Sequence, residues 1–334
     1  MTENSRSAWS DFRRWLPGVI ISLIALYTVF KLASWQDLSK AFSTIRIGFL
    51  IPGLILVTLW LVIRAVTWRT LLEGKVSLSQ TFRAINIGYL LNNLLPLRAG
   101  ELGRAIVLGK SSGLGTSNVL STIVIERAFD LAFAAGLLLS TLPLALEMEW
   151  AKSVAIITLS LVFIGLLVLF LVANNSKKVQ EWIEKYGTRW RISRKYILPQ
   201  LTSLLTGLEV LTNPRRFLLC LLLSGSSWVI AVIFYYVMLL SIAPDAPLWW
   251  AIFSQAVLAM GIALPSAPAA LGVFEASMVG GLTILGVDYS KALAYAILMH
   301  FMQFLVTGIF GFISLAKERH SIGSLFSETR RKNE

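Results

Sequence analysis

The sequence has few of the residues from which soluble enzymes build their active sites. Its 334 residues include one cysteine, Cys220, and two histidines, His300 and His320. A single cysteine excludes an internal disulfide and a thiolate metal cluster, and two histidines far apart in the sequence argue against a metal site built on imidazole. The motifs of zinc proteases and P-loop enzymes are absent from the sequence as well. We therefore expect no metal, no cofactor and no catalytic residue of these types.

Charged residues are scarce too. They make up 14% of the chain against 56% hydrophobic residues, whereas roughly 25% of a soluble domain is charged. A membrane-spanning helix needs about 20 apolar residues, and such runs predict an all-α polytopic membrane protein. Six full spans are expected, near residues 15–33, 48–68, 117–144, 151–173, 217–241 and 291–316. Arg64 is placed at the inner edge of the second span.

Two further apolar runs are broken in the middle. The first, 82–110, is interrupted by Pro96 and Gly100, and the second, 248–286, by Pro265, Pro268 and Gly272. Lipid satisfies neither a charge nor a freed backbone group, so breaks of this kind should line a cavity. We expect each run to enter the membrane, turn and leave on the same side as a re-entrant helical hairpin.

The two broken runs resemble each other. Residues 94–104 align without gaps on 263–273, which places Pro96 on Pro265 and Gly103 on Gly272. Three spans separate the runs, so one enters from each side of the membrane. This predicts an inverted repeat of the kind found in secondary transporters.

The distribution of basic residues predicts the orientation. With both termini inside, 24 of the 30 Lys and Arg residues lie on the inner side and 5 outside, as the positive-inside rule requires. The chain is expected to be one integral domain, 1–334, in a bacterial cytoplasmic membrane. Its parts would be a first half (48–146) with the cytoplasmic hairpin 82–110, a basic cytoplasmic loop (174–213), a second half (214–316) with the outer hairpin 248–286, and a cytoplasmic tail (317–334). The basic loop should lie against anionic phospholipid headgroups.

The first candidate site follows the break in the first hairpin. Arg98, Glu101 and Arg104 recur at spacings of three and share roughly one helix face. Arginines there could grip a phosphate with two hydrogen bonds each, with Glu101 orienting them or meeting an amine. Alternatively, the charges only reach to the membrane surface and fix the topology. Asn93 could bond a headgroup or pack between helices.

A second group of charges lies inside the following span. Glu126, Arg127 and Asp130 would give an isolated span a net negative charge, and each charge costs roughly 2.5 to 3.5 kcal/mol to insert. They therefore need partners. One interpretation is an ion-pair clamp from Glu126 or Asp130 to Arg98 or Arg104, and the other is a role in binding substrate or a coupling proton.

The second half carries fewer candidates. Glu275 has no cation nearby in the sequence, and is interpreted either as a proton or amine site or as the outer anchor of the cavity. His300 lies in the last span, where it is either a ligand or proton group or an ordinary interior histidine.

These motifs resemble those of a known family. The stretch NNLLPLRAGELGR at Asn92–Arg104, the ERAFD of Glu126–Asp130 and the LPSAPAALGVFE that ends at Glu275 are similar to the signature of the flippase-like family that includes the transmembrane region of lysylphosphatidylglycerol synthase. The resemblance covers about 48–316. It implies movement of aminoacylated phospholipid between leaflets, or work beside polyprenyl-linked or dolichyl-linked sugar pathways and hopanoid synthesis. The synthase's soluble aminoacyl-transferase domain has no counterpart here, so we expect no synthesis of lysyl lipid.

Together these features predict a lipid flippase for a phosphate-bearing amphiphile, such as a phospholipid, an aminoacyl-phospholipid or a polyprenyl-phosphate-linked lipid. It would not be an enzyme and would not bind nucleic acid. The alternatives are an enzyme of lipid-linked glycosyl transfer or lipid modification, and a scaffold for a partner synthase or glycosyltransferase. Because the second hairpin lacks the arginines, we expect the phosphate grip on the inner side and a gate on the outer side.

Overall fold

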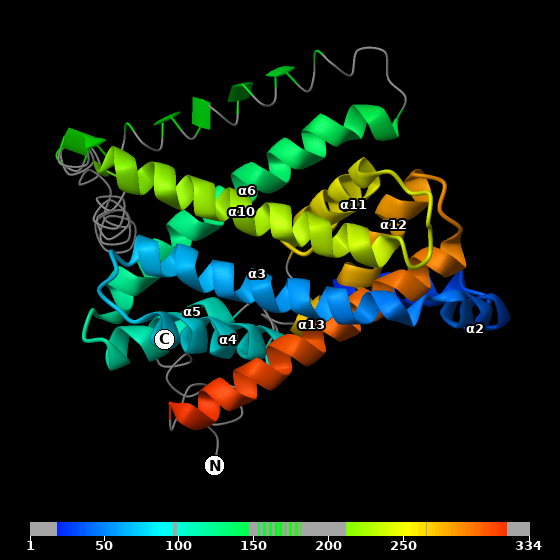
Figure 1. Ribbon diagram of the computed structural model, residues 1–334, viewed down its shortest axis with the longest axis horizontal. Helices are drawn as coiled ribbons and strands as arrows, with labels where there is room; N and C mark the ends of the chain where they lie inside the picture. The colour runs from blue at the N-terminus through cyan, green and yellow to red at the C-terminus, as the bar shows by residue number, and fades with distance from the viewer. Residues whose placement is uncertain are drawn as a thin grey trace, which may run out of the picture.

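The computed structural model describes residues 19–95, 99–146, 212–264 and 266–318, with scattered positions between 153 and 181. Every element in these ranges is a helix (Figure 1). Four helical segments are long and apolar enough to cross a membrane, namely Ile47–Leu71, Thr116–Ala145, Pro214–Leu239 and Tyr289–Lys317. They coincide with four of the predicted spans and confirm the all-α membrane fold. Most of the predicted span 151–173 and of the basic loop 174–213 lies outside the described residues.

Apolar side chains cover the outer faces of the long helices. Leu54 and Ile55 on one helix, Leu131 on a second and Phe312 on a third are all exposed. Water would make such continuous apolar faces unfavourable, whereas the hydrocarbon of a bilayer does not. The exposed faces thus independently indicate a membrane environment.

The first predicted span departs from a straight helix. The helix Val19–Lys31 is followed after a short break by α2 (Trp35–Thr44), which leaves at an angle of 86°. Ser34 caps α2, since its hydroxyl accepts a hydrogen bond from the backbone N–H of Asp37, as helix N-caps commonly do. The buried residues of α2, Leu38 and Ala41, belong to the same core as the last helix of the chain.

Both broken runs fold as pairs of short helices. The first pair is α4 (Leu78–Leu94) with α5 (Gly100–Ser111), and the second is α11 (Leu248–Gly261) with α12 (Val273–Ile284), preceded by the 3-10 turn η4 (Pro268–Ala270). The members of each pair pack on each other. Gly100 begins α5, and Pro268 and Gly272 lie in the break between α11 and α12. Pro96 and Pro265, which the sequence placed at the two tips, lie outside the described residues.

Glycines allow each pair to close. A Cβ atom on Gly100 would lie 1.9 Å from the carbonyl oxygen of Gly88, so the backbones of α4 and α5 meet directly. In the second pair, a Cβ on Gly261 would lie 1.9 Å from the hydroxyl of Ser277. Small residues commonly permit this close approach between membrane helices.

The order of elements repeats along the chain. The 3-10 turn η1 (Ile47–Phe49) leads into α3 (Leu50–Leu71), and α3, the first helix pair and α6 (Thr116–Ala145) correspond to α10 (Pro214–Leu239), the second pair and α13 (Tyr289–Lys317). Their packing repeats as well: α3 lies against α10, α13 packs on α4, and α6 packs on α11. In Figure 1 the two helix pairs lie toward opposite ends of the α3–α10 pair. The short sequence match thus extends to whole halves of the molecule.

Polar contacts tie together the helix ends on each side. At one end Arg216 pairs with Glu73 at 3.4 Å, and Arg83 pairs with Glu318 at 2.5 Å. At the opposite end, the backbone N–H of Arg46 donates to the carbonyl oxygen of Ser241 at 3.4 Å. The first end also carries Arg69, Lys75, Lys110, Arg215 and Lys317. This basic end is the one that the sequence assigns to the cytoplasm.

Candidate functional site

Six charged side chains meet where the first helix pair packs against α3 and α6. α3 contributes one arginine, α5 a glutamate and an arginine, and α6 an acidic pair with an arginine between them. The members of this ionic network are Arg64, Glu101, Arg104, Glu126, Arg127 and Asp130. Three positive and three negative formal charges cancel. The network brings together five residues that the sequence proposed for the site and adds Arg64.

Arg64 lies at the centre of the network. Its guanidinium grips Asp130 with two parallel bonds, Nη1 to Oδ1 at 2.7 Å and Nη2 to Oδ2 at 3.0 Å, and Nη2 also donates to Oε1 of Glu126. This fork geometry is specific to arginine. The two carboxylates of α6 thus find the cation that an isolated span could not supply.

Arg104 occupies the side of the network toward the hairpin. Its Nη2 pairs with Glu101 Oε2 at 2.6 Å and with Glu126 Oε2 at 3.1 Å, so the structure contains the predicted ion pair between Arg104 and Glu126. The guanidinium also lies 4.6 Å from the ring centroid of Trp68, and Trp68 Nε1 donates to Thr122 Oγ1 at 3.0 Å. Arg104 is therefore enclosed and committed to contacts within the protein.

Arg127 forms the accessible edge of the network. Its side chain is 35% exposed, against 4% for Arg64 and for Arg104. Its Nη2 lies 2.9 Å from Glu126 Oε1 and 3.0 Å from Asp130 Oδ2, and its buried Nε has no hydrogen-bond partner among the described residues. Glu101, 22% exposed, and Asp130, 18% exposed, flank it. We call Glu101, Arg127 and Asp130 the rim of the network.

The network also reaches the second half of the molecule. Trp228 of α10 donates its Nε1–H to Asp130 Oδ1 at 3.2 Å. Inserted singly, such charges would each cost roughly 2.5 to 3.5 kcal/mol, whereas within the network each has opposite partners. The arrangement fixes α5 to α6 and α3, and leaves one edge for another anion or cation to approach.

The placement of Arg64 corrects the sequence interpretation. The sequence placed Arg64 at the inner edge of a span ending near residue 68, but α3 continues to Leu71 and Arg64 is buried. At 1.5 Å per residue, seven residues put it about 10 Å inside the helix end. A signal was present, because Trp60 and Trp68 stand one turn to either side of it, and an arginine within a continuous apolar run needs a buried partner.

Other proposed residues lie apart from the network. Arg98 lies outside the described residues. Asn93 Nδ2 donates to Thr307 Oγ1 of α13 at 2.9 Å, which is the packing alternative for this residue. In the described part of the chain, no group of three His, Cys, Asp or Glu side chains is placed to hold a metal ion.

The second half carries a separate polar pair. Glu275 of α12 and His300 of α13 are both buried, with Glu275 Oε1 2.6 Å from His300 Nδ1. This pair lies beside the tip of the second hairpin. It occupies the position between short and long helix that the ionic network occupies in the first half.

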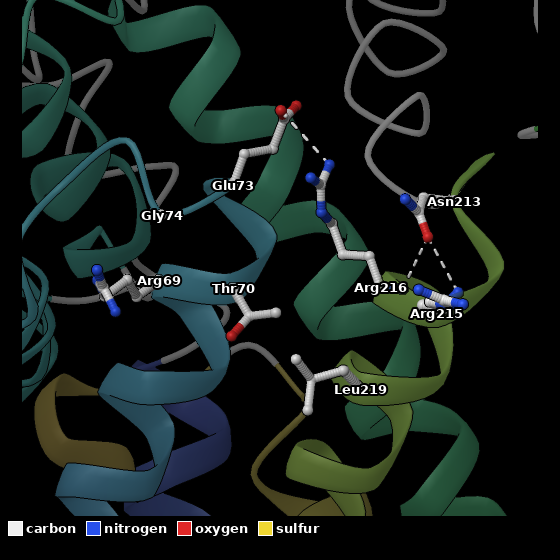
Figure 2. Close-up of a pocket in the computed structure, with 8 residues that line it drawn as sticks. All are labelled: Arg69, Thr70, Glu73, Gly74, Asn213, Arg215, Arg216 and Leu219. Atoms are coloured by element: carbon white, nitrogen blue, oxygen red, sulfur yellow. Dashed lines mark hydrogen bonds and ion pairs between the residues drawn. The ribbon is translucent and has the colours of Figure 1, made fainter.

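A surface pocket opens at the basic end of the molecule, between the end of α3 and the start of α10 (Figure 2). The cavity has a volume of about 340 Å³. It is lined by Arg69, Thr70, Glu73, Gly74, Asn213, Arg215, Arg216 and Leu219. Asn213 caps α10, since its side-chain oxygen accepts from the backbone N–H groups of Arg215 and Arg216. Three guanidinium groups and one carboxylate make the pocket suited to an anion.

Comparison with known proteins places the chain in a family of membrane proteins, in agreement with the fold. The model of the family described as the lysylphosphatidylglycerol synthase TM region matches residues 15–311. The chain belongs to this family. Two similar proteins are UPF0104 membrane proteins of archaea. The one from Methanocaldococcus jannaschii is 25% identical over 233 residues, which cover 67% of this chain and 92% of the relative. The one from Methanothermobacter thermautotrophicus is 24% identical over 290 residues, covering 81% and 82%.

The family match confirms the resemblance that the sequence motifs indicated, and with the helices it establishes a multi-pass membrane protein. No solved structure matches the chain. The contacts within the network therefore come from this structure alone.

Proposed function

We propose that the protein is a transporter that moves a phosphate-bearing lipid between membrane leaflets without changing it chemically. The observation that carries the proposal is the pairing of two helix hairpins, one toward each end of the α3–α10 pair, with a charge network at the first of them. A transporter needs a polar site that opens alternately to either side, and inverted halves provide this. A one-sided enzyme has no need of the second hairpin.

In this proposal both hairpins are re-entrant and both termini lie in the cytoplasm. The basic end with Arg69, Arg83 and Lys110 faces inward, as the positive-inside rule favours. The first hairpin then enters from the cytoplasm and the second from outside. The lipid tails remain in the bilayer while the headgroup crosses between the hairpins.

The rim of the network would meet the headgroup. Arg104 is enclosed by Glu101, Glu126 and Trp68, so among the described members of the network the cation accessible to a phosphate is Arg127. A phosphate that approaches Arg127 would compete with the carboxylates of Glu101 and Asp130. These carboxylates in turn would suit the amine of an aminoacylated lipid.

The surface pocket would attract the headgroup first. Its arginines, Arg69, Arg215 and Arg216, lie where anionic headgroups of the inner leaflet are expected, and each such charge contributes about 1 kcal/mol of attraction to an anionic surface. Arg215 and Arg216 continue the basic loop that the sequence assigned to the cytoplasmic surface.

The test is leaflet transfer in vesicles that contain the purified protein. Fluorescent phosphatidylglycerol, lysyl-phosphatidylglycerol and a polyprenyl phosphate would be compared by the fraction that a membrane-impermeant quencher reaches. We expect transfer of at least one of these lipids above protein-free vesicles, a marked loss in Arg127→Gln, and none in Lys40→Gln, an exposed cation at the opposite end.

Two results would overturn the proposal. One is transfer no faster than in protein-free vesicles for every lipid, and the other is equal transfer by wild type and Arg127→Gln. A new product formed from lipid phosphate and a sugar donor would favour the enzyme.

A further inference from the structure

The tip of the second hairpin has a backbone conformation that needs support. Ala269 and Ala270 have φ angles of 58° and 57°, and Gly272 has 82°. Residues other than glycine rarely adopt this left-handed region, and they persist there only when surrounding contacts hold them. A specific contact should therefore fasten the tip.

The backbone N–H of Ala267 donates to Ser22 Oγ at 2.9 Å, and a second contact comes from His300 of α13. Its Nε2 lies 2.9 Å from the carbonyl oxygen of Ala269, one of the two left-handed alanines. Its Nδ1 lies 2.6 Å from Glu275 Oε1, while Glu275 Oε2 accepts from the backbone N–H of Gly272 at 2.7 Å. The ring of Phe274 stacks on the imidazole with centroids 4.3 Å apart. One histidine and one carboxylate thus hold both ends of the strained turn.

The hydrogen bonds fix the number of protons on the pair. A backbone carbonyl can only accept, so Nε2 of His300 must carry a hydrogen. Between Nδ1 and Oε1, at 2.6 Å, there must be one more proton, on the imidazole or on the carboxyl. Without it, two lone pairs would face each other at hydrogen-bond distance, and the contact would break.

The neighbouring elements supply no alternative charge to the pair. Among the described residues, α11 has no ionisable side chain, and the helix 19–31 carries Tyr27 and Lys31, with the ammonium of Lys31 over the Tyr27 ring. Arg83 of α4 is paired with Glu318 at the other end of the molecule. The remaining ionisable groups on the packed elements are Arg64 and Arg69 of α3, Tyr89 of α4, Arg215, Arg216, Cys220, Tyr235 and Tyr236 of α10, Asp37 and Lys40 of α2, and Tyr289, Lys291, Tyr295 and Lys317 of α13.

We propose that Glu275 and His300 form a proton-binding site that fastens the tip of the second hairpin. With the shared proton bound, the imidazole bridges the carboxyl and the Ala269 carbonyl, and the left-handed turn is held against α13. When the proton leaves, the one remaining ring hydrogen can serve only one of the two contacts of His300, to Glu275 Oε1 or to the Ala269 carbonyl, and the bridge that joins the turn to α13 is broken at the other. The site thus converts the loss of one proton into release of the tip.

The site also has a consequence for transport, and this consequence rests on the proposed function. If the second hairpin is the outer gate, a proton gradient across the membrane would bias its opening. The proton site itself does not depend on lipid transport.

The first test measures the proton directly. The chain has only two histidines, so His320→Gln leaves His300 as the single histidine, and ¹⁵N-histidine labelling then gives one imidazole signal. We expect both ring nitrogens to be bonded to or sharing a proton at low pH, and loss of one proton as the pH is raised. Glu275→Gln should abolish this pattern. A neutral, singly protonated ring unaffected by Glu275→Gln would overturn the proposal.

The second test measures release of the tip. A spin label at Leu271→Cys, an exposed position beside Gly272, is attached in a Cys220→Ser background. We expect an immobile label at low pH and a mobile one at high pH in otherwise wild-type protein, and a mobile label at every pH in His300→Gln. Gln303 lies on α13 one turn from His300 and bonds to Tyr235 of α10. Gln303→Leu removes this bond and should leave the transition unchanged. Identical spectra in wild type and His300→Gln at all pH values would contradict tip release.

The third test separates the proton site from transport. Leaflet transfer is measured with and without a pH gradient. Dependence on the gradient in wild type and its loss in Glu275→Gln support coupling, while gradient-independent transfer overturns the coupling and leaves the proton site standing. If wild type moves no lipid, the proposed function fails and the imidazole measurement is unaffected.

Discussion

The two halves of the molecule fasten their hairpins in different ways at equivalent places. In the first half, α5 is joined to α6 by charges that cancel within the ionic network. In the second half, α12 is joined to α13 by one carboxylate and one histidine. Arginine does not lose its proton in proteins, whereas an imidazole can gain or lose one. The same fold therefore has one permanent fastening and one that can respond to protons.

The close contacts at the glycines of the two helix pairs also suggest that the first hairpin is the more firmly held. In the first pair Gly100 meets the backbone of Gly88, and in the second Gly261 meets the side chain of Ser277. A backbone contact cannot adjust without moving a helix, whereas a serine hydroxyl can rotate, which leaves the Ser277 Cβ at 2.8 Å as the remaining obstacle to a Cβ on Gly261. Both differences indicate a fixed first hairpin and an adjustable second one.

The largest expected effect comes from removing the central cation of the first half. Arg64→Leu leaves Glu126 and Asp130 short of their principal partner, and breaking a buried pair costs about 3–5 kcal/mol. His300→Leu in the second half should cost less, about 1–3 kcal/mol, because the single carboxylate left behind can take up a proton. Thermal unfolding in detergent measures both.

Arg69→Leu is the matched control for Arg64→Leu, since Arg69 is on the same helix but lies at the surface pocket. We expect it to stay within about 1 kcal/mol of wild type. Equal stability of the Arg64→Leu and Arg69→Leu proteins would show that the network does not hold the first half together.

The next prediction tests whether Arg127 binds the lipid headgroup or only stabilises the ionic network. Arg127→Gln should reduce lipid transfer about tenfold, equivalent to about 1.4 kcal/mol, because a charge-assisted contact to the headgroup is lost. Its stability should fall by less than that of Arg64→Leu, since Arg127 is the exposed member. Loss of stability as large as in Arg64→Leu, with transfer by the remaining folded protein unchanged, would assign Arg127 to the fastening alone.

Substitutions at the close contacts of Gly100 and Gly261 should give a smaller difference in stability between the two halves. Gly100→Ala should destabilise the protein by about 1–3 kcal/mol, since overpacking there forces two backbones apart. Gly261→Ala should cost less, and Ser277→Gly in the same chain should recover most of the loss. If Gly261→Ala costs as much as Gly100→Ala, or Ser277→Gly does not rescue it, the second hairpin is as fixed as the first.

The smallest effect concerns one of the contacts that cross between the halves. Asn93 bonds Thr307 at 2.9 Å, and such bonds between membrane helices average about 0.6 kcal/mol in double-mutant cycles. A cycle of Asn93→Ala and Thr307→Val should give a coupling of that size in stability. Zero coupling, combined with a loss of lipid transfer in Asn93→Ala, would move Asn93 from packing to headgroup binding.

Much of the fold could be predicted because breaks in apolar runs have few physical solutions. Gly100 and Gly272 indicated where α5 and α12 begin, and the long apolar runs outside the two broken runs indicated the four long helices. Cationic partners for Glu126 and Asp130 could be predicted, because inserting an unpaired charge into a membrane is costly.

The identity of the central cation could not be read from the sequence. Arg64 reaches Glu126 and Asp130 from 62 and 66 residues away, across a packing of α3 on α6 that no local pattern encodes. Whether Arg64 needs a buried partner depends on where its helix ends. An arginine at a helix end needs none, whereas an arginine that lies two turns inside the helix does. The bond from His300 to Glu275 likewise depends on how α12 returns beside α13.

The central claim is that the two hairpins open toward opposite sides of the membrane, and cysteine labelling tests it most directly. In a Cys220→Ser background, single cysteines replace Lys75 and Asp245, exposed residues in the equivalent loops before α4 and α11. A membrane-impermeant maleimide should label Asp245→Cys in intact cells, and Lys75→Cys only after the cells are permeabilised. Labelling of both cysteines from the same side would contradict the account.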